Sequence, residues 1–293
     1  MYDMQAYYEA TSVPHAISLL QEHPDALIIA GGSDVLIKMR EGKLAGCKLV
    51  SIQMLDELHG VRLDDDGTLR ILPLTCFTDI TQHPLIQKHI GVLGEAVDLV
   101  GGPQIRNIGT IGGNVCNGVT SADSASTLIA WDAVMEVSGP EGIRTIPIRD
   151  FYVKAGVVAL QPAEILTAIL IPPSSYENCV GHYIKYAMRN AMDIATLGCS
   201  VNVRLSPDKR TMERVRIGFG VAGPIPMRAV SAEAAANGQP IMPEAIEKAA
   251  KATLEDVHPR DSWRASKELR LHLVEELTKR ALTRSIELAG GKV

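Results

Sequence analysis

Apolar residues near the start of the chain form two short continuous runs, separated by segments with helical spacing. The run Ala26–Ala30 is wholly apolar and Lys48–Ile52 is largely so, which is typical of buried strands. A serine followed two residues later by a proline predicts a helix over residues 12–24, and a second helix is predicted at Val35–Met39. The pattern therefore predicts a small βαβ lobe over residues 1–58.

The middle of the chain mixes both periodicities and predicts a second, α+β lobe over residues 59–176. Its expected end is the stretch Pro172–Ser175, because the two prolines interrupt helices and strands alike. This places a domain boundary between residues 176 and 177. The expected strands are Leu69–Leu72, Ala133–Val137, Gly142–Ile148 and Glu164–Ile171, and the expected helices are Thr75–Thr81, Pro84–Val100 (closed by Gly101 and Gly102) and Ser124–Trp131.

The last part of the chain, residues 177–293, begins with strand-like alternation and ends with helical spacing. The last helix has an apolar face that predicts packing against a sheet. Antiparallel strands are expected at His182–Ala187, Gly198–Leu205 and Glu213–Val221, and helices at Ala229–Asn237, Pro243–Glu255 and Ser266–Ala289, the last with Leu269, Leu273, Leu277 and Ala281 on its apolar face.

Composition narrows the class of protein. With 46% hydrophobic but only 4% aromatic residues in 293, the chain predicts an ordered, aliphatic core. A net charge of −5 argues against a partner held by its phosphate backbone, so no nucleic acid is expected. The five cysteines are scattered, without iron–sulfur spacing, and the histidines form no metal-binding pattern, so no metal is expected. Without a targeting segment or an apolar run of membrane-spanning length, we predict a cytoplasmic protein with no membrane span.

Two glycine-centred turns, Ala30–Asp34 and Gln104–Asn114, stand where apolar runs give way to polar sequence. Glycine permits positive φ and close approach, and successive backbone N–H groups in such turns can form an anion site without Lys or Arg. The alternative is a pair of ordinary tight turns. The second turn has neither the GxxxxGK[ST] pattern nor the GxGxxG spacing, and we expect no helix directly after it.

Read together, the segments AGGSD and RNIGTIGGN resemble the two loops that hold the flavin pyrophosphate in the FAD-binding subunits of molybdenum hydroxylases. The resemblance implies an α+β, two-lobed FAD-binding fold of the vanillyl-alcohol-oxidase/PCMH type, followed by an α+β C-terminal flavoprotein domain. It also implies that FAD contacts Leu27, Ile28, Ile29, Ala30, Gly31, Gly32, Ser33, Asp34, Gly109, Thr110, Ile111, Gly112, Gly113, Asn114, Asn117, Asp123, Ile165, Leu166, Ile184 and Lys185.

The carboxylate of Asp123 has two interpretations. Ahead of an apolar helix, Asp123 is typical of a helix N-cap. By the resemblance, its carboxylate lies at the isoalloxazine or the ribityl chain of the flavin. Asn114 and Asn117 would then add hydrogen bonds nearby, although Asn117 is equally typical of a turn. Arg106 either reaches a phosphate or anchors its own loop.

The segment Tyr183–Asp193 resembles the pattern FxKxxxRxxxDxA of the family's C-terminal domain, in which Lys185 is the lysine. An ammonium near the pyrimidine end of the flavin would stabilise negative charge in the reduced state and raise the reduction potential. The alternative is a solvated lysine at a strand end. Asp193 is expected to cap its loop or pair with Arg189.

A second glycine pattern, Gly218–Gly223, does fit GxGxxG, yet Pro224 and Pro226 follow it at once. A dinucleotide-binding helix cannot open there, because its N-terminal N–H groups must face the pyrophosphate. We therefore interpret this segment as a strand and a turn.

The function implied by the resemblance is electron relay in an oxidoreductase complex. Electrons from a molybdenum-cofactor subunit would pass through [2Fe–2S] clusters on a partner subunit to FAD here. Xanthine is the leading substrate, with another purine, an aromatic compound or an aldehyde as alternatives, and NAD is the leading acceptor, with O₂ or a quinone as alternatives. Two alternatives stay open at this point. One is a flavin-free nucleotide-binding regulatory or scaffold protein, and the other is a self-sufficient flavin oxidase.

Overall fold

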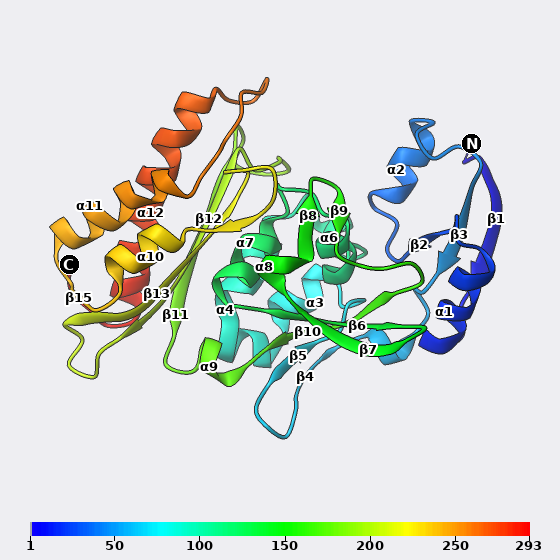
Figure 1. Cartoon of the computed structure of the whole chain (residues 1–293), viewed down its shortest axis with the longest axis horizontal. Helices are drawn as coiled ribbons and strands as arrows, with labels where there is room; N and C mark the ends of the chain where they lie inside the picture. Colours follow the sequence, from blue (N-terminus) through cyan, green and yellow to red (C-terminus); the bar gives the residue numbers. More distant parts are fainter. Residues whose placement is uncertain (1) are drawn as a thin grey trace.

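The computed structural model describes residues 2–293, in which three larger sheets follow one another along the chain, besides one two-stranded sheet (Figure 1). The first sheet is parallel, with the strand order β1-β3-β2. Strand β1 was not predicted, because its aromatic and polar residues are largely exposed and form no apolar run. This lobe contains β1 (Met4–Glu9), α1 (Val13–Glu22), β2 (Leu27–Ile29), α2 (Val35–Arg40), β3 (Cys47–Ser51) and η1 (Asp56–Leu58).

The middle sheet is antiparallel, with the order β4-β5-β10-β6-β7, and the largest apolar core of the protein lies between it and α3, α4 and α7. Its strands are β4 (Val61–Leu63), β5 (Leu69–Ile71), β6 (Val134–Gly139), β7 (Gly142–Pro147) and β10 (Ile165–Ile171), beside the small pair β8 (Tyr152–Lys154) and β9 (Val157–Val158). Its helices are α3 (Phe77–Gln82), α4 (Pro84–Asp98), α5 (Pro103–Arg106), α6 (Ile111–Cys116), α7 (Asp123–Ala130), α8 (Ile148–Phe151) and α9 (Pro173–Tyr176).

The third sheet is also antiparallel, and α10 and α12 cover the face turned away from the middle sheet (Figure 1). On α12, Leu273, Leu277 and Ala281 are buried as expected, but Leu269 in the first turn of the helix is 39% exposed. The elements are β11 (Val180–Tyr186), β12 (Leu197–Leu205), β13 (Thr211–Gly220), β14 (Met227–Arg228), β15 (Gln239–Pro240), α10 (Val230–Ala236), α11 (Pro243–Ala252), η2 (Thr253–Glu255) and α12 (Lys267–Leu288).

Helix α7 joins the middle and the third sheet, because all of its residues are buried and it packs directly on β12 and β13. We call this contact surface the seam. A Cβ on Gly218 would lie 2.2 Å from the Ser126 carbonyl oxygen, and one on Gly181 would lie 2.0 Å from the Trp131 ring. Glycines in the strands therefore allow the helix to approach at backbone distance.

The GxGxxG-like segment Gly218–Gly223 is confirmed as the end of β13 followed by a turn, since the next helix, α10, begins only at Val230. The expectation that no helix follows the second glycine turn was wrong. Thr110 caps the six-residue helix α6, and its hydroxyl accepts the Gly113 N–H at 3.1 Å. Within residues 2–293, the helices lack a segment apolar and long enough to span a membrane.

Candidate functional site

The two glycine turns lie against each other in the structure, although residues 35–103 separate them in the sequence. A Cβ on Gly31 would lie only 1.8 Å from the carbonyl oxygen of Ile108, which belongs to the second turn. Only glycine permits this approach, because any side chain would collide with backbone. The contact joins the first lobe to the middle lobe and brings the two turns together.

The backbone N–H groups of the first turn have no acceptor within residues 2–293. Those of Gly31, Gly32, Ser33 and Asp34 donate to neither a backbone nor a side-chain oxygen. Gly32 has φ of +69°, in the left-handed region that favours glycine. N–H groups left without partners between a strand and a helix start are typical of an anion site.

The second turn is built differently, because most of its N–H groups are used inside the protein. The Ile111 N–H donates to the Thr75 oxygen at 3.1 Å and the Gly112 N–H to the Pro73 oxygen at 2.8 Å. A Cβ on Gly112 would also lie 2.4 Å from the Cβ of Pro73, whereas Gly113 is exposed and faces open space apart from the Thr110 hydroxyl. The second turn is thus fixed by hydrogen bonds to its own protein surroundings, and the absence of a side chain at Gly113 leaves open space on its exposed side.

Lys38 on α2 links the first turn to the end of α6, and sequence reasoning missed this contact. The Lys38 ammonium is 2.5 Å from a carboxylate oxygen of Asp34 and donates to the side-chain oxygen of Asn117 at 3.1 Å. The available signal was the i,i+4 spacing of Asp34 and Lys38 at the start of a predicted helix. Lys38 therefore neutralises the Asp34 carboxylate at the end of the first turn, so this turn carries no unpaired negative charge.

A buried ion pair crosses the seam at the start of α7. The Asp123 carboxylate accepts from the Lys185 ammonium at 2.8 Å and from the Tyr183 hydroxyl at 2.7 Å, and Lys185 also donates to the Leu99 carbonyl at 2.9 Å. The side chains of Asp123 and Lys185 are only 6% and 8% exposed. The N-cap interpretation of Asp123 was wrong, because Asp123 is the first helical residue and its side chain makes no cap hydrogen bond.

Burial changes the pKa values of the groups around this ion pair. It raises the pKa of the Asp123 carboxyl above its ordinary value, and the Lys185 ammonium and the Tyr183 hydroxyl act against that shift. Burial and the neighbouring carboxylate raise the pKa of Tyr183 as well, so this hydroxyl stays a hydrogen-bond donor. Because the ammonium of Lys185 is bound by Asp123 and Leu99 and its side chain is nearly buried, the solvated alternative for Lys185 is wrong.

The remaining candidate residues lie at different depths. Ile165 and Leu166 start β10 and are buried in two apolar cores, so only their backbone can face a ligand. Ile184 packs against the core of the third sheet, since strand alternation turns it away from Lys185. Asn114 lies near the pair, because its side-chain oxygen accepts from Ser124 at 2.7 Å.

Arg106 anchors its own loop, which was one of its two interpretations. Its guanidinium is 3.0 Å from the Asp98 carboxylate and donates to the Val100 and Gly101 carbonyls. Asp193 also caps its loop, since its carboxylate accepts from the backbone N–H groups of Arg189 and Ile194.

Beside the buried pair, a cavity of about 440 Å³ opens between the middle lobe and the third sheet. Lys185 forms part of its wall, so the cavity gives access to the seam from outside. No group of three His, Cys, Asp or Glu residues in the described part of the chain is arranged to hold a metal ion. The cavity is lined by Asp98, Leu99, Gly101, Arg106, Lys185, Tyr186, Ala187, Arg189, Asn190, Ala191, Met192 and Asp193.

Two family models match the chain. One, described as the FAD binding domain in molybdopterin dehydrogenase, matches residues 2–174, and the other, the CO dehydrogenase flavoprotein C-terminal domain, matches residues 182–285. The chain is 43% identical over 293 residues, 100% of both chains, to the putative xanthine dehydrogenase FAD-binding subunit of Escherichia coli (strain K12).

The similarity extends to carbon monoxide dehydrogenase. The medium chain of the Hydrogenophaga pseudoflava enzyme is 30% identical over 277 residues, which cover 94% of this chain and 95% of that one. The solved structure of that enzyme lacking the Mo-pyranopterin moiety of its cofactor matches with a TM-score of 0.92 over 99% of both chains. The fold class expected from the sequence is thereby confirmed.

Proposed function

Because the chain belongs to the family of FAD-binding subunits of molybdenum hydroxylases, we propose that it relays electrons between partner subunits and a soluble acceptor. As a member of this family it is part of an oxidoreductase, and its cofactor is FAD. In the proposal, a molybdenum-cofactor subunit oxidises xanthine or another purine, and [2Fe–2S] clusters on a further subunit deliver the electrons. The acceptor is NAD⁺ and the complex works in the cytoplasm.

The observation that carries the proposal is the row of four backbone N–H groups, Gly31–Asp34, that lack acceptors where the two glycine turns meet. In the proposal, a pyrophosphate supplies the missing acceptor oxygens, and the open space beside Gly113 accommodates it. Lys38 neutralises the Asp34 carboxylate at the end of the first turn, and its ammonium also donates to Asn117 at the end of α6. These residues fit the diphosphate of FAD by charge and by shape.

In the proposal, the flavin ring binds at the seam, with the domain boundary between residues 176 and 177. When bound, FAD exchanges electrons singly or in pairs, which suits a relay between clusters and a two-electron acceptor. The chain contributes the cavity beside Lys185, and the Asp123 carboxylate and the Leu99 carbonyl hold that ammonium in place. A fixed cation there favours added negative charge on the cofactor.

The metal centres of the proposed complex belong to other chains. The five cysteines of this chain are free thiols, and within residues 2–293 no cluster of potential ligands is arranged for a metal. Purine hydroxylation therefore requires the partners, and this requirement gives a direct test.

We expect the isolated, FAD-loaded chain to show no dye reduction with xanthine or hypoxanthine, but to reduce the dye with NADH as the donor. Both reactions are followed by dye absorbance, with the same protein stripped of FAD as the control. Purine turnover by the isolated chain would indicate a self-sufficient oxidase instead. A chain purified without flavin that cannot be loaded with FAD would indicate a scaffold protein.

A second prediction concerns the reduction potential. Lys185→Met removes the buried ammonium, so added charge on the cofactor loses a stabilising partner, and the potential should fall by ~30 mV or more, which for a two-electron couple is about tenfold in the equilibrium constant. The measurement is a redox titration of the flavin-loaded fraction. Lys248→Met, an exposed lysine on α11, is the matched control and should leave the potential unchanged. An unchanged potential in Lys185→Met would exclude Lys185 from the flavin site.

A further inference from the structure

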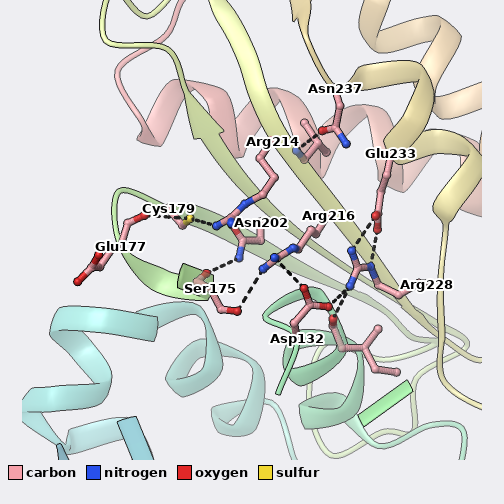
Figure 2. Close-up of polar contacts among 12 residues, drawn as sticks. Asp132, Ser175, Glu177, Cys179, Asn202, Arg214, Arg216, Arg228, Glu233 and Asn237 are labelled. Carbon is pink, nitrogen blue, oxygen red and sulfur yellow. Dashed lines mark hydrogen bonds and ion pairs between the residues drawn. The ribbon is translucent and has the colours of Figure 1, made fainter. Parts of the chain in front are cut away.

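A second set of charged residues crosses the seam at the opposite end of α7. Asp132 follows the C-cap residue of the helix, and its carboxylate points toward two arginines of the third sheet (Figure 2). One oxygen lies 2.7 Å from the guanidinium of Arg216 on β13, and the other accepts a hydrogen bond from Arg228 on β14. Asp132 therefore ties the helix to the two strands at this edge of the sheet.

The two arginines differ in how much they depend on Asp132. Arg228 also forms a two-pronged pair with Glu233, at 2.5 and 2.7 Å. Arg216 has no carboxylate partner except Asp132 within residues 2–293, and its other side-chain contact is the Ser175 hydroxyl at 3.3 Å (Figure 2). Only 14% of the Arg216 side chain is exposed, and burial lowers its pKa, against which Asp132 acts.

The backbone and the neighbouring ring also fix this end of the helix. Asp132 has φ of +46°, a left-handed conformation that Asp tolerates better than most residues, and its N–H donates to the Ile129 oxygen. The preceding residue, Trp131, is buried and lies against the backbone of Gly181 on β11. The left-handed turn that ends the helix thus goes together with the position of the Asp132 carboxylate beside the two arginines.

Both ends of one short helix therefore carry a carboxylate bound to the third sheet: Asp123 to Lys185 on β11, and Asp132 to Arg216 and Arg228. An eight-residue helix is rigid, so its position at one end determines its position at the other. We propose that Asp132 is a positioning residue, which clamps the third sheet on α7 and so holds Lys185 against Asp123 in the flavin site. The inference rests on the proposed function for the role of Lys185, whereas the clamp itself concerns only this chain.

The test uses the full chain with Trp263→Phe, which leaves Trp131 at the seam as the only tryptophan. Asp132→Asn keeps the shape and the left-handed backbone but removes the charge. Asp132→Asn combined with Arg216→Gln also removes the buried arginine that would otherwise lose its partner. Glu213→Gln is the matched control, because Glu213 pairs with Arg204 within the third sheet and does not cross the seam.

We expect both Asp132 variants to bind FAD about tenfold more weakly, as for the loss of one coupled buried interaction, and to show a lower flavin potential. Trp131 fluorescence should become more accessible to acrylamide in the FAD-free protein. Glu213→Gln should match the parent in all three measurements. Removing Arg216 should restore stability to the double variant without restoring the potential, since the clamp is still absent.

The opposite pattern would overturn the inference: a double variant whose FAD affinity, flavin potential and Trp131 quenching all equal those of the parent. Such a result would mean that Asp132 serves only to neutralise Arg216. If the parent itself bound no FAD, the proposed function would fail, and quenching of Trp131 in the FAD-free variants would then decide the clamp alone.

Discussion

Gly113→Asp should abolish FAD binding while the protein remains folded. Gly113 is exposed, and the nearest atom to a Cβ at this position is the Thr110 hydroxyl oxygen, 2.9 Å away, so the protein can accommodate the new side chain by a small movement. In the proposed site the cofactor cannot, because the aspartate would add bulk and negative charge where the pyrophosphate is expected to bind. We expect a loss of affinity of about 100-fold or more, or ~2.7 kcal/mol.

The measurement is flavin absorbance per polypeptide, together with a titration of the FAD-free protein. Gly113→Asn has nearly the same volume without the charge, so the difference between the two variants gives the electrostatic part of the effect. Gly91→Asp adds the same charge on α4, where a Cβ would meet no atom within 4 Å, and should bind FAD normally. Stoichiometric FAD in Gly113→Asp would show that the second turn does not hold the cofactor.

Asp123→Ala should lower the free energy of unfolding by about 3–5 kcal/mol, as expected when one partner of a buried ion pair is removed. The Lys185 ammonium would retain only the Leu99 carbonyl as a partner, and the buried Tyr183 hydroxyl would lose its acceptor. This is a large part of the ~5–15 kcal/mol that stabilises a typical domain. The experiment is denaturant unfolding of the FAD-free protein, which separates folding from cofactor binding.

The control for this prediction is the double variant Asp123→Ala with Lys185→Met. Because the unpaired charge is then absent, the double variant should be more stable than Asp123→Ala alone. Equal stability of the two would mean that the ammonium finds another partner, and that the pair contributes little to the fold.

Much of the fold could be predicted from local pattern. The buried runs at β2 and β3, the serine cap of α1 and the alternation along β11–β13 are signals within a few residues of the element they define. Strand β1 lacked such a signal, because its pairing with β3 involves residues more than 40 positions away. The short helix α6 was missed because Gly112 and Gly113 disfavour a helix, and the cap at Thr110 outweighs them.

Motifs that are continuous in sequence identified the candidate residues, including both glycine turns, Asp123 and Lys185. The contact between Asp123 and Lys185 was not predicted, because the two residues lie on segments far apart in the sequence. The hydroxyl of Tyr183, the bridge made by Lys38 and the cluster around Asp132 depend on which strands and helices meet, and a sequence states this only through the fold. Arg216 and Arg228 in particular have no helical or strand spacing that marks them as partners of Asp132.

The burial of α7 on both sides also affects how the chain folds during its synthesis. The helix ends at Ala130, but the strands that cover its second face begin only at Leu197, so an emerging chain carries an uncovered apolar surface while about half of the later sequence is still being synthesised. Closure of the seam is therefore a late step of folding, and until then the nascent chain depends on dilution or chaperones to avoid association.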